Sequence, residues 1–104
     1  MARVIVEQVF TEPMTDDRYS AFAKAIDPCL EIRHGLWRRS SLSTDRLRMT
    51  CEFEAPDAGS VREAFRSAGI DFVRVWTAEV FAIEDYPDMM KKLAALLEAN
   101  AKTG

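Results

Sequence analysis

The sequence predicts an α+β protein with the ferredoxin-like β-α-β-β-α-β order, a four-stranded antiparallel sheet and an extra C-terminal helix. Four segments rich in β-branched and aromatic residues are typical of strands, and they cover residues 3–10, 36–43, 46–54 and 72–83. Segments with apolar residues at helical spacing follow the first and third strands, and another follows Pro87. In this order two helices cover one face of the sheet. The other face must be solvated, covered by a partner or used for binding.

The size and the net charge limit the classes of protein to which this chain can belong. The 104 residues suit one domain, which we expect to span residues 1–84, followed by an amphipathic helix over 85–104 that packs on this domain or on a neighbouring subunit. The net charge of −3 lacks the basic character of a nucleic-acid partner. No segment approaches the roughly 20 apolar residues of a membrane span, and the N-terminus lacks a secretory pattern. We therefore expect a cytoplasmic protein with no nucleic-acid or membrane partner.

The first helix has a clear beginning and a less certain end. Thr15 is a suitable N-cap, and two aspartates follow it in the first turn. Pro28 either lies inside the helix and kinks it, or stands first in a second short helix capped by Asp27. Gly35 is the expected stop after the helix. The apolar stripe consists of Tyr19, Phe22, Ala23, Ile26 and Leu30.

A hairpin joins the second and third strands. The third strand alternates apolar and polar residues, and a turn at residues 44–45 would pair Leu42 with Leu47 and Trp37 with Glu52. This register places one apolar and one polar face on the hairpin. It also puts Cys51 on the core side, with Arg38 beside it.

The second helix can begin in two ways. Asp57 can cap it directly, or Ser60 and Glu63 can form a capping box one turn later. Gly69 ends it. The C-terminal helix carries its own apolar stripe, made of Met89, Met90, Leu93, Leu96 and Leu97. That stripe is buried either on its own domain or across a neighbouring subunit.

Several stretches together resemble a known family of small bacterial ferredoxin-like domains, which includes nickel-binding or nickel-responsive proteins. The resemblance rests on "VIVEQVF", on "WRRS" with Trp37 and Ser40, on "CEFEAPD" and on "VREAFRSAG", and covers roughly residues 3 to 80. It implies the same fold. The family pattern often has histidines at the positions of Arg39 and Ala64, and neither arginine nor alanine can ligate a metal at neutral pH. We therefore expect no metal and no cofactor here.

Few side chains are suited to covalent or metal chemistry. The chain has two cysteines, one histidine and no CxxC or HExxH motif. Cys51 is expected to be a small buried residue rather than a reactive thiol, and Cys29 to be structural. His34 suits the end of the first helix, where its positive form favours the dipole.

The uncovered face of the sheet is the candidate site. Two tryptophans among arginines and carboxylates are unusual for a merely solvated surface, and they suit either a homodimer interface or a pocket for a small anionic or aromatic ligand. The candidate ligand-binding or interface residues are Glu7, Trp37, Arg39, Arg48, Glu52, Arg74 and Trp76.

Three functions remain open from the sequence. The first is a homo-oligomeric domain that binds a small molecule or effector on this face. The second is a cofactor-independent enzyme, an oxygenase or isomerase of the dimeric α+β barrel type, with Glu7, Glu52 or His34 as its general base. The third is a structural or interaction protein. A cavity lined by Trp37, Trp76 and arginines would favour the first two.

Overall fold

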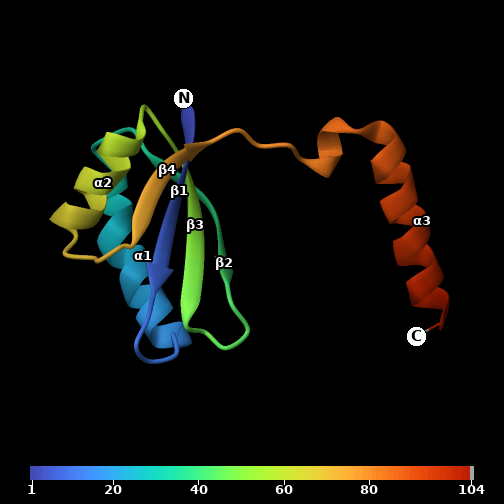
Figure 1. The fold of residues 1–104 in the computed structure, drawn as a ribbon, viewed down its shortest axis with the longest axis horizontal. Coiled ribbons are helices and arrows are strands. Elements are labelled where there is room, and N and C mark those ends of the chain that lie inside the picture. The colour runs from blue at the N-terminus through green and yellow to red at the C-terminus, as the bar shows by residue number, and fades with distance from the viewer. Residues whose placement is uncertain (104) are drawn as a thin grey trace.

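The computed structural model describes residues 1–103 and has the predicted order of elements (Figure 1). The strands are β1 (Ala2–Val9), β2 (Leu36–Leu42), β3 (Arg48–Ala55) and β4 (Arg74–Ala78). The helices are α1 (Asp16–Glu31), α2 (Ala58–Ser67) and α3 (Pro87–Thr103), with a 3-10 turn η1 (Ile83–Asp85) before α3. The sheet is antiparallel in the order β2-β3-β1-β4. The ferredoxin-like α+β fold is therefore confirmed.

The core lies between the sheet and the pair α1 and α2. Its centre is Phe65 of α2, whose ring lies 5.7–5.9 Å from the rings of Phe22, Phe53 and Phe72. Phe53 and Phe65 are completely buried, as are Val4 and Val6 of β1. Apolar residues therefore meet from both layers, as the alternation of the strands and the spacing of the helices require.

Helix α1 begins as predicted and ends differently. The Thr15 hydroxyl accepts the Arg18 N–H at 3.1 Å, and one helix continues through Pro28. The expected stop at Gly35 was wrong by one residue, because His34 adopts the left-handed conformation (φ 60°) that follows the helix. The next N–H, that of Gly35, donates to the Leu30 carbonyl at 2.8 Å. A Cβ at Gly35 would lie 3.1 Å from Leu30 Cδ2, so close packing, not a positive φ, favours glycine there.

The predicted register of the β2–β3 hairpin was wrong by two residues. Leu42 pairs with Met49 instead of Leu47. The Asp45 carboxylate accepts the Ser43 hydroxyl at 2.6 Å and the Leu47 N–H at 3.0 Å. This side-chain turn removes Leu47 from the ladder and lengthens the loop beyond the predicted two residues. A shift of two leaves the faces unchanged near the loop.

Helix α2 uses the first of its two predicted caps. Asp57 accepts the backbone N–H of Ser60 at 2.7 Å and the hydroxyl of the same serine at 2.9 Å. Gly69 follows the helix with φ 71°, so its predicted role as the terminator is confirmed.

The chain leaves the sheet earlier than predicted. Strand β4 ends at Ala78 instead of continuing to residue 83, because Ala78 pairs with Arg3 near the beginning of β1 and little of the partner strand remains. Residues 79–103, which we call the C-terminal arm, then extend away from the domain (Figure 1). Among the described residues, α3 packs against η1 and no other element, so of the two predicted alternatives, the domain or a neighbouring subunit, packing on the domain is not seen. None of the helices in residues 1–103 has the length and apolar character needed to cross a membrane.

Candidate functional site

The open face of the sheet, opposite α1 and α2, carries nearly all the predicted residues. The cross-strand pairs form two rows, one of Arg39, Glu52, Ile5 and Trp76 and one of Ser41, Thr50, Glu7 and Arg74. Glu52 and Glu7 thus stand one row apart near the middle of the sheet, each beside an arginine of a neighbouring strand. The alternation of the strands predicted correctly that these residues share one face, although the predicted register paired Arg39 with Thr50.

Trp37 was predicted on the open face, and the structure places it on the other side. A β-bulge between Trp37 and Arg39 inserts one extra residue, so Trp37 pairs with Phe53 instead of Glu52. Its indole N–H donates to the Ser40 hydroxyl at 3.0 Å, and Ser40 also accepts the Tyr19 hydroxyl at 3.2 Å. One inserted residue therefore turns the indole toward α1. The register also puts Ser40, not Arg38, opposite Cys51.

One end of the open face is an Arg–Glu network. Glu52 accepts from Arg3 at 3.0 Å and from Arg39 at 3.1 Å. Glu54 lies 3.3 Å from Arg3 and 3.8 Å from Arg38. Three guanidinium groups thus share two carboxylates, which leaves one excess positive charge on this part of the sheet. The Arg3 Nε is buried and has no hydrogen-bond partner within the described residues.

Four residues at the start of the C-terminal arm, Val80, Ala82, Glu84 and Asp85, line a pocket of about 620 Å³ together with this network, the arginine pocket. On its far side Glu84 and Asp85 carry two carboxylates, and neither forms an ion pair within the described part of the chain. The lining of the pocket therefore has a cationic wall on the sheet and an anionic wall on the arm. The lining consists of Arg3, Leu36, Trp37, Arg38, Arg39, Glu52, Val80, Ala82, Glu84 and Asp85.

The other predicted residues gather at the opposite end of the face. Glu7 accepts the indole N–H of Trp76 at 2.9 Å and lies 3.8 Å from Arg74. Glu7, Arg48 and Arg74 line a separate hollow of about 420 Å³. The structure thus divides the candidate residues into two groups, with Trp37, Arg39 and Glu52 in the arginine pocket. The predicted single cavity lined by both tryptophans is not formed, because Trp37 lines the arginine pocket and Trp76 does not.

Sequence reasoning missed Arg3, Arg38, Glu54 and the two carboxylates of the arm. Arg3 could have been found, because it alternates with Ile5 and Glu7 along β1 and so belongs to the open face. The two carboxylates of the arm could not have been found, because residues 79–83 were expected to continue the strand.

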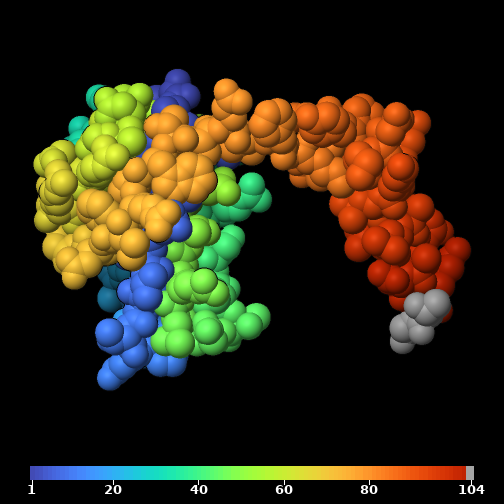
Figure 2. Space-filling model, in the orientation of Figure 1, coloured from blue at the N-terminus to red at the C-terminus, as the bar shows by residue number. Residues whose placement is uncertain are grey.

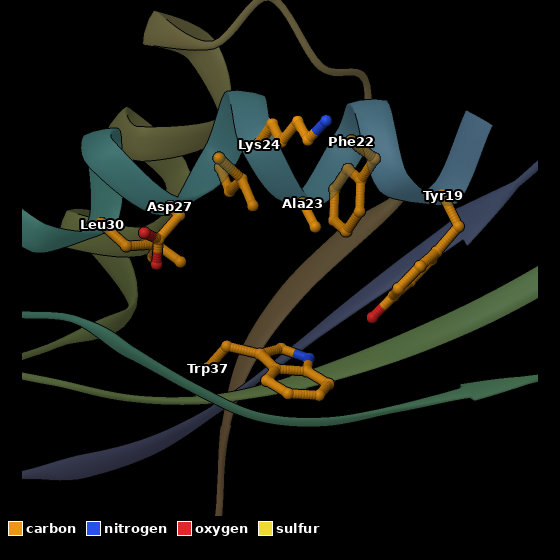
Figure 3. Close-up of a pocket in the computed structure, with 8 residues that line it drawn as sticks. Tyr19, Phe22, Ala23, Lys24, Asp27, Leu30 and Trp37 are labelled. Atoms are coloured by element: carbon orange, nitrogen blue, oxygen red, sulfur yellow. The ribbon is translucent and has the colours of Figure 1, made fainter. Parts of the chain in front are cut away.

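A second concavity lies on the opposite side of β2. Helix α1 and Trp37 enclose an apolar groove of about 510 Å³, the aromatic groove, and Figure 3 shows Tyr19, Phe22 and Trp37 directed into it. Trp37 is 48% exposed there. The groove is lined by Tyr19, Phe22, Ala23, Lys24, Ile26, Asp27, Leu30 and Trp37.

Neither the cysteines nor the histidine form a reactive centre. Cys51 is completely buried, and burial raises the pKa of its thiol to about 11, against a smaller opposite effect of the Ser40 hydroxyl that donates to the sulfur at 3.1 Å. The prediction that Cys51 is a core residue is confirmed. Exposed His34 follows the end of α1 and is not among the residues that line the arginine pocket.

The fold and its surfaces define a small α+β domain with a ferredoxin-like sheet, one covered face and one polar face. A family model described as nickel responsive protein SCO4226-like matches residues 4–77. The chain therefore belongs to the SCO4226-like family, and the resemblance seen in the sequence is confirmed. No match was found among curated proteins.

The crystal structure of SCO4226 from Streptomyces coelicolor A3(2) is similar to this chain in fold. The two superpose with a TM-score of 0.71 at 15% sequence identity, over 78% of this chain and 100% of that chain. The family match ends at residue 77, before the C-terminal arm begins.

The residues present do not fit a nickel ion. At the two positions where histidines were considered, Arg39 is paired with Glu52 and Ala64 is completely buried in the core. In residues 1–103 no three histidine, cysteine, aspartate or glutamate side chains are grouped as metal ligands would be. Burial raises the pKa of the Cys51 thiol to about 11, which disfavours the thiolate form that a metal ion binds.

Proposed function

We propose that this protein is a small-ligand-binding domain and that the arginine pocket is its binding site. The observation that carries the proposal is that one pocket is lined by three arginines of the sheet and by the carboxylates of Glu84 and Asp85 of the arm. A concave site with a few convergent polar groups is the usual form of a ligand site. The volume of about 620 Å³ is within the range of small-molecule pockets.

The opposite charges of the walls favour a zwitterionic ligand. An acidic group can accept from Arg39, whose side chain is 62% exposed and donates to Glu52 through its Nε at 3.1 Å, so that its other N–H groups can reach a ligand. An amino group can donate to Glu84 or Asp85, which have no cationic partner in the described residues. Leu36, Val80 and Ala82 add apolar surface to the lining of the same pocket. An amino acid with an apolar side chain, such as phenylalanine, has all three complementary parts.

Catalysis has less support. A general base must be free to take a proton, whereas Glu7 accepts from Trp76 and Glu52 accepts from two arginines. We therefore propose binding without a reaction. Nickel is not proposed as the ligand of this chain, because its donor set does not fit the ion.

Calorimetric titration with three probes tests the proposal. Phenylalanine carries both charges, benzoate only the acid and phenethylamine only the amine, so phenylalanine should bind most tightly. Arg39→Gln should raise the Kd for phenylalanine about tenfold or more, because a charge-assisted hydrogen bond is lost. Arg48→Gln is the matched control at the other end of the face and should leave the Kd unchanged.

Glu84→Gln tests the anionic wall of the pocket independently of the cationic wall. It should weaken the binding of phenylalanine while leaving benzoate unaffected. If none of the three probes binds, or if Arg39→Gln and Arg48→Gln have equal effects, the arginine pocket is not a zwitterion site.

A further inference from the structure

The hollow at the other end of the open face is rich in hydrogen-bond donors, and we call it the Arg48 hollow. It measures about 420 Å³ and shares no lining residue with the arginine pocket. Its lining carries two positive charges, on Arg48 and Arg74, and one negative charge, on Glu7. This part of the sheet is therefore cationic in a chain whose net charge is −3. A cationic concavity attracts an anionic ligand.

Polar side chains of all four strands line up beside this hollow. Ser41, Thr50, Glu7 and Arg74 are paired across β2, β3, β1 and β4, and Arg48 lies two residues before Thr50 on the same face of β3. Ser41 and Thr50 are exposed, and neither hydroxyl is hydrogen-bonded within residues 1–103. Because β3 and β4 lie on either side of β1, roughly 10 Å separates them, and the two arginines can hold one group between them.

The two arginines keep most of their hydrogen-bonding capacity. In the part of the chain that the structure describes, the Arg48 guanidinium forms no hydrogen bond and no ion pair. Hydrogen bonds from within its own loop lower the pKa of Asp45 more than the charge of Arg48 does. Arg74 approaches Glu7 only through its Nε, at 3.8 Å, and 71% of its side chain is exposed. Both guanidinium groups can therefore donate to a ligand.

Glu7 is the one negative charge of the hollow, and its carboxylate already has a strong partner. It accepts the indole N–H of Trp76 at 2.9 Å. Trp76 pairs with Ile5, in the row on the side of Glu7 away from Arg48. This hydrogen bond therefore draws the carboxylate away from Arg48, and the space beside Arg48 is left to donors.

A phosphate group is the anion that best matches these donors. It has three strong acceptor oxygens and a charge between −1.5 and −2 at about pH 7. The planar fork of arginine fits two phosphate oxygens at once, and a hydroxyl can donate to the third. Val9 and Val73 are 62% and 54% exposed in the same lining, so an apolar substituent on the phosphate would cover them.

The Arg48 hollow is accessible from solvent. The C-terminal arm leaves the sheet beside Arg3, where β1 begins, whereas Arg48 pairs with Val9, where β1 ends. Figure 2 shows an open space between the sheet and the arm. A small ligand can therefore reach this end of the open face without displacing the arm.

We propose that the Arg48 hollow is a second ligand site, which binds the phosphate group of a small phosphate monoester with an apolar substituent. Arg48 and Arg74 donate to the phosphate oxygens from β3 and β4, and Thr50 donates its hydroxyl. Val9 and Val73 contact the substituent. The site does not depend on the proposed amino-acid ligand, because the two cavities lie at opposite ends of the face and have no residue in common.

Calorimetric titration of the full-length protein with phenyl phosphate, inorganic phosphate and phenyl sulfate tests the site. Phenyl phosphate should bind most tightly, because inorganic phosphate lacks the apolar part and phenyl sulfate carries only one charge. Arg48→Gln and Arg74→Gln should each raise the Kd for phenyl phosphate about tenfold or more. Arg66→Gln is the matched control, because it removes the same charge from α2 on the covered side of the sheet, and it should leave this Kd unchanged.

Glu7→Gln should have the opposite effect. It removes the negative charge from the hollow, while its amide oxygen can still accept the indole N–H of Trp76. The Kd for phenyl phosphate should therefore fall about threefold. A variant that merely disturbed the fold would not bind more tightly, and thermal unfolding of each variant confirms that the domain is folded.

Three results would overturn the proposal. They are no binding of phenyl phosphate at millimolar concentration, equal effects of Arg48→Gln and Arg66→Gln, or inorganic phosphate binding as tightly as phenyl phosphate. A Kd for phenyl phosphate that responds to Arg39→Gln but not to Arg48→Gln would place the phosphate in the arginine pocket, which also contradicts the proposal. Phenylalanine titrated into the same variants reports separately on the arginine pocket.

Discussion

The domain and the C-terminal arm differ in how they use apolar residues. In the domain, Phe65 is completely buried and touches three other aromatic rings, whereas in the arm Leu96 and Leu97 are more than half exposed. Both segments have a clear helical stripe in the sequence. A stripe thus predicts a helix in both places, but it does not say which surface buries it.

The largest expected difference comes from truncating one apolar residue in each region. Phe65→Ala removes the centre of the core and should lower the free energy of unfolding by about 3–5 kcal/mol. Leu96→Ala in the arm should change the unfolding of the domain by less than about 0.5 kcal/mol. Urea denaturation followed by tryptophan fluorescence measures both. Equal losses would mean that α3 belongs to the cooperative unit of the domain.

Thiol labelling gives the next largest contrast. With a pKa near 11 instead of 9, Cys51 has about a hundredfold less thiolate near neutral pH, and its complete burial slows the reaction further. Iodoacetamide should therefore label the partly exposed Cys29 and leave Cys51 unmodified until the protein is denatured. An added Ala95→Cys in the arm should react as fast as a free peptide. Rapid labelling of Cys51 in the native protein would contradict its burial.

A backbone substitution should have a smaller effect. Gly69 follows α2 with φ 71°, a conformation that alanine adopts at a cost of about 1 kcal/mol. Gly69→Ala should reduce the stability of the domain by this amount in a thermal melt. Ala94→Gly, its counterpart in the arm, should leave the same melting transition unchanged, even though glycine weakens the helix locally.

An effect of similar size, but dependent on pH, is expected at the cap of α2. Hydrogen bonds from the Ser60 N–H and hydroxyl hold the pKa of Asp57 below its usual value. A carboxylate with a lowered pKa in the folded state stabilises fully above its unfolded pKa, and this contribution disappears as the pH falls through the folded pKa. Asp57→Ala should lower the Tm by about 5 °C at pH 7.

The pH dependence supplies the control for this cap. The difference in Tm between Asp57→Ala and the parent should shrink as the pH falls below about 4. Asp88→Ala, in the first turn of α3, should not move the melting transition of the domain. A difference in Tm that stays constant to pH 2 would show that the Asp57 carboxylate is not the stabilising group.

The sequence predicted the fold and most of one face because both follow from periodicity. Arg39, Glu52, Glu7, Arg74 and Trp76 all lie where strand alternation puts them. The errors arise where a turn or a bulge shifts which residues of neighbouring strands are paired. The Asp45 turn shifts the hairpin, and the bulge before Arg39 moves Trp37 to the other face. Neither a side-chain turn nor a bulge alters the apolar pattern enough to be recognised beforehand.

The arm was harder to predict for a different reason. Residues 79–83 have the composition of a strand, but almost no partner strand remains for them to pair with, and this depends on where β1 begins. The arginine pocket therefore includes two carboxylates, Glu84 and Asp85, that no motif indicated.

The central claim is that the C-terminal arm lies outside the packed domain, and hydrogen exchange tests it most directly. Amides of residues 88–103 should exchange quickly at every protein concentration, while the amides of β1 and β3 stay protected throughout. Strong protection of α3 at every dilution would show that the helix is covered within its own chain, and the account would be wrong.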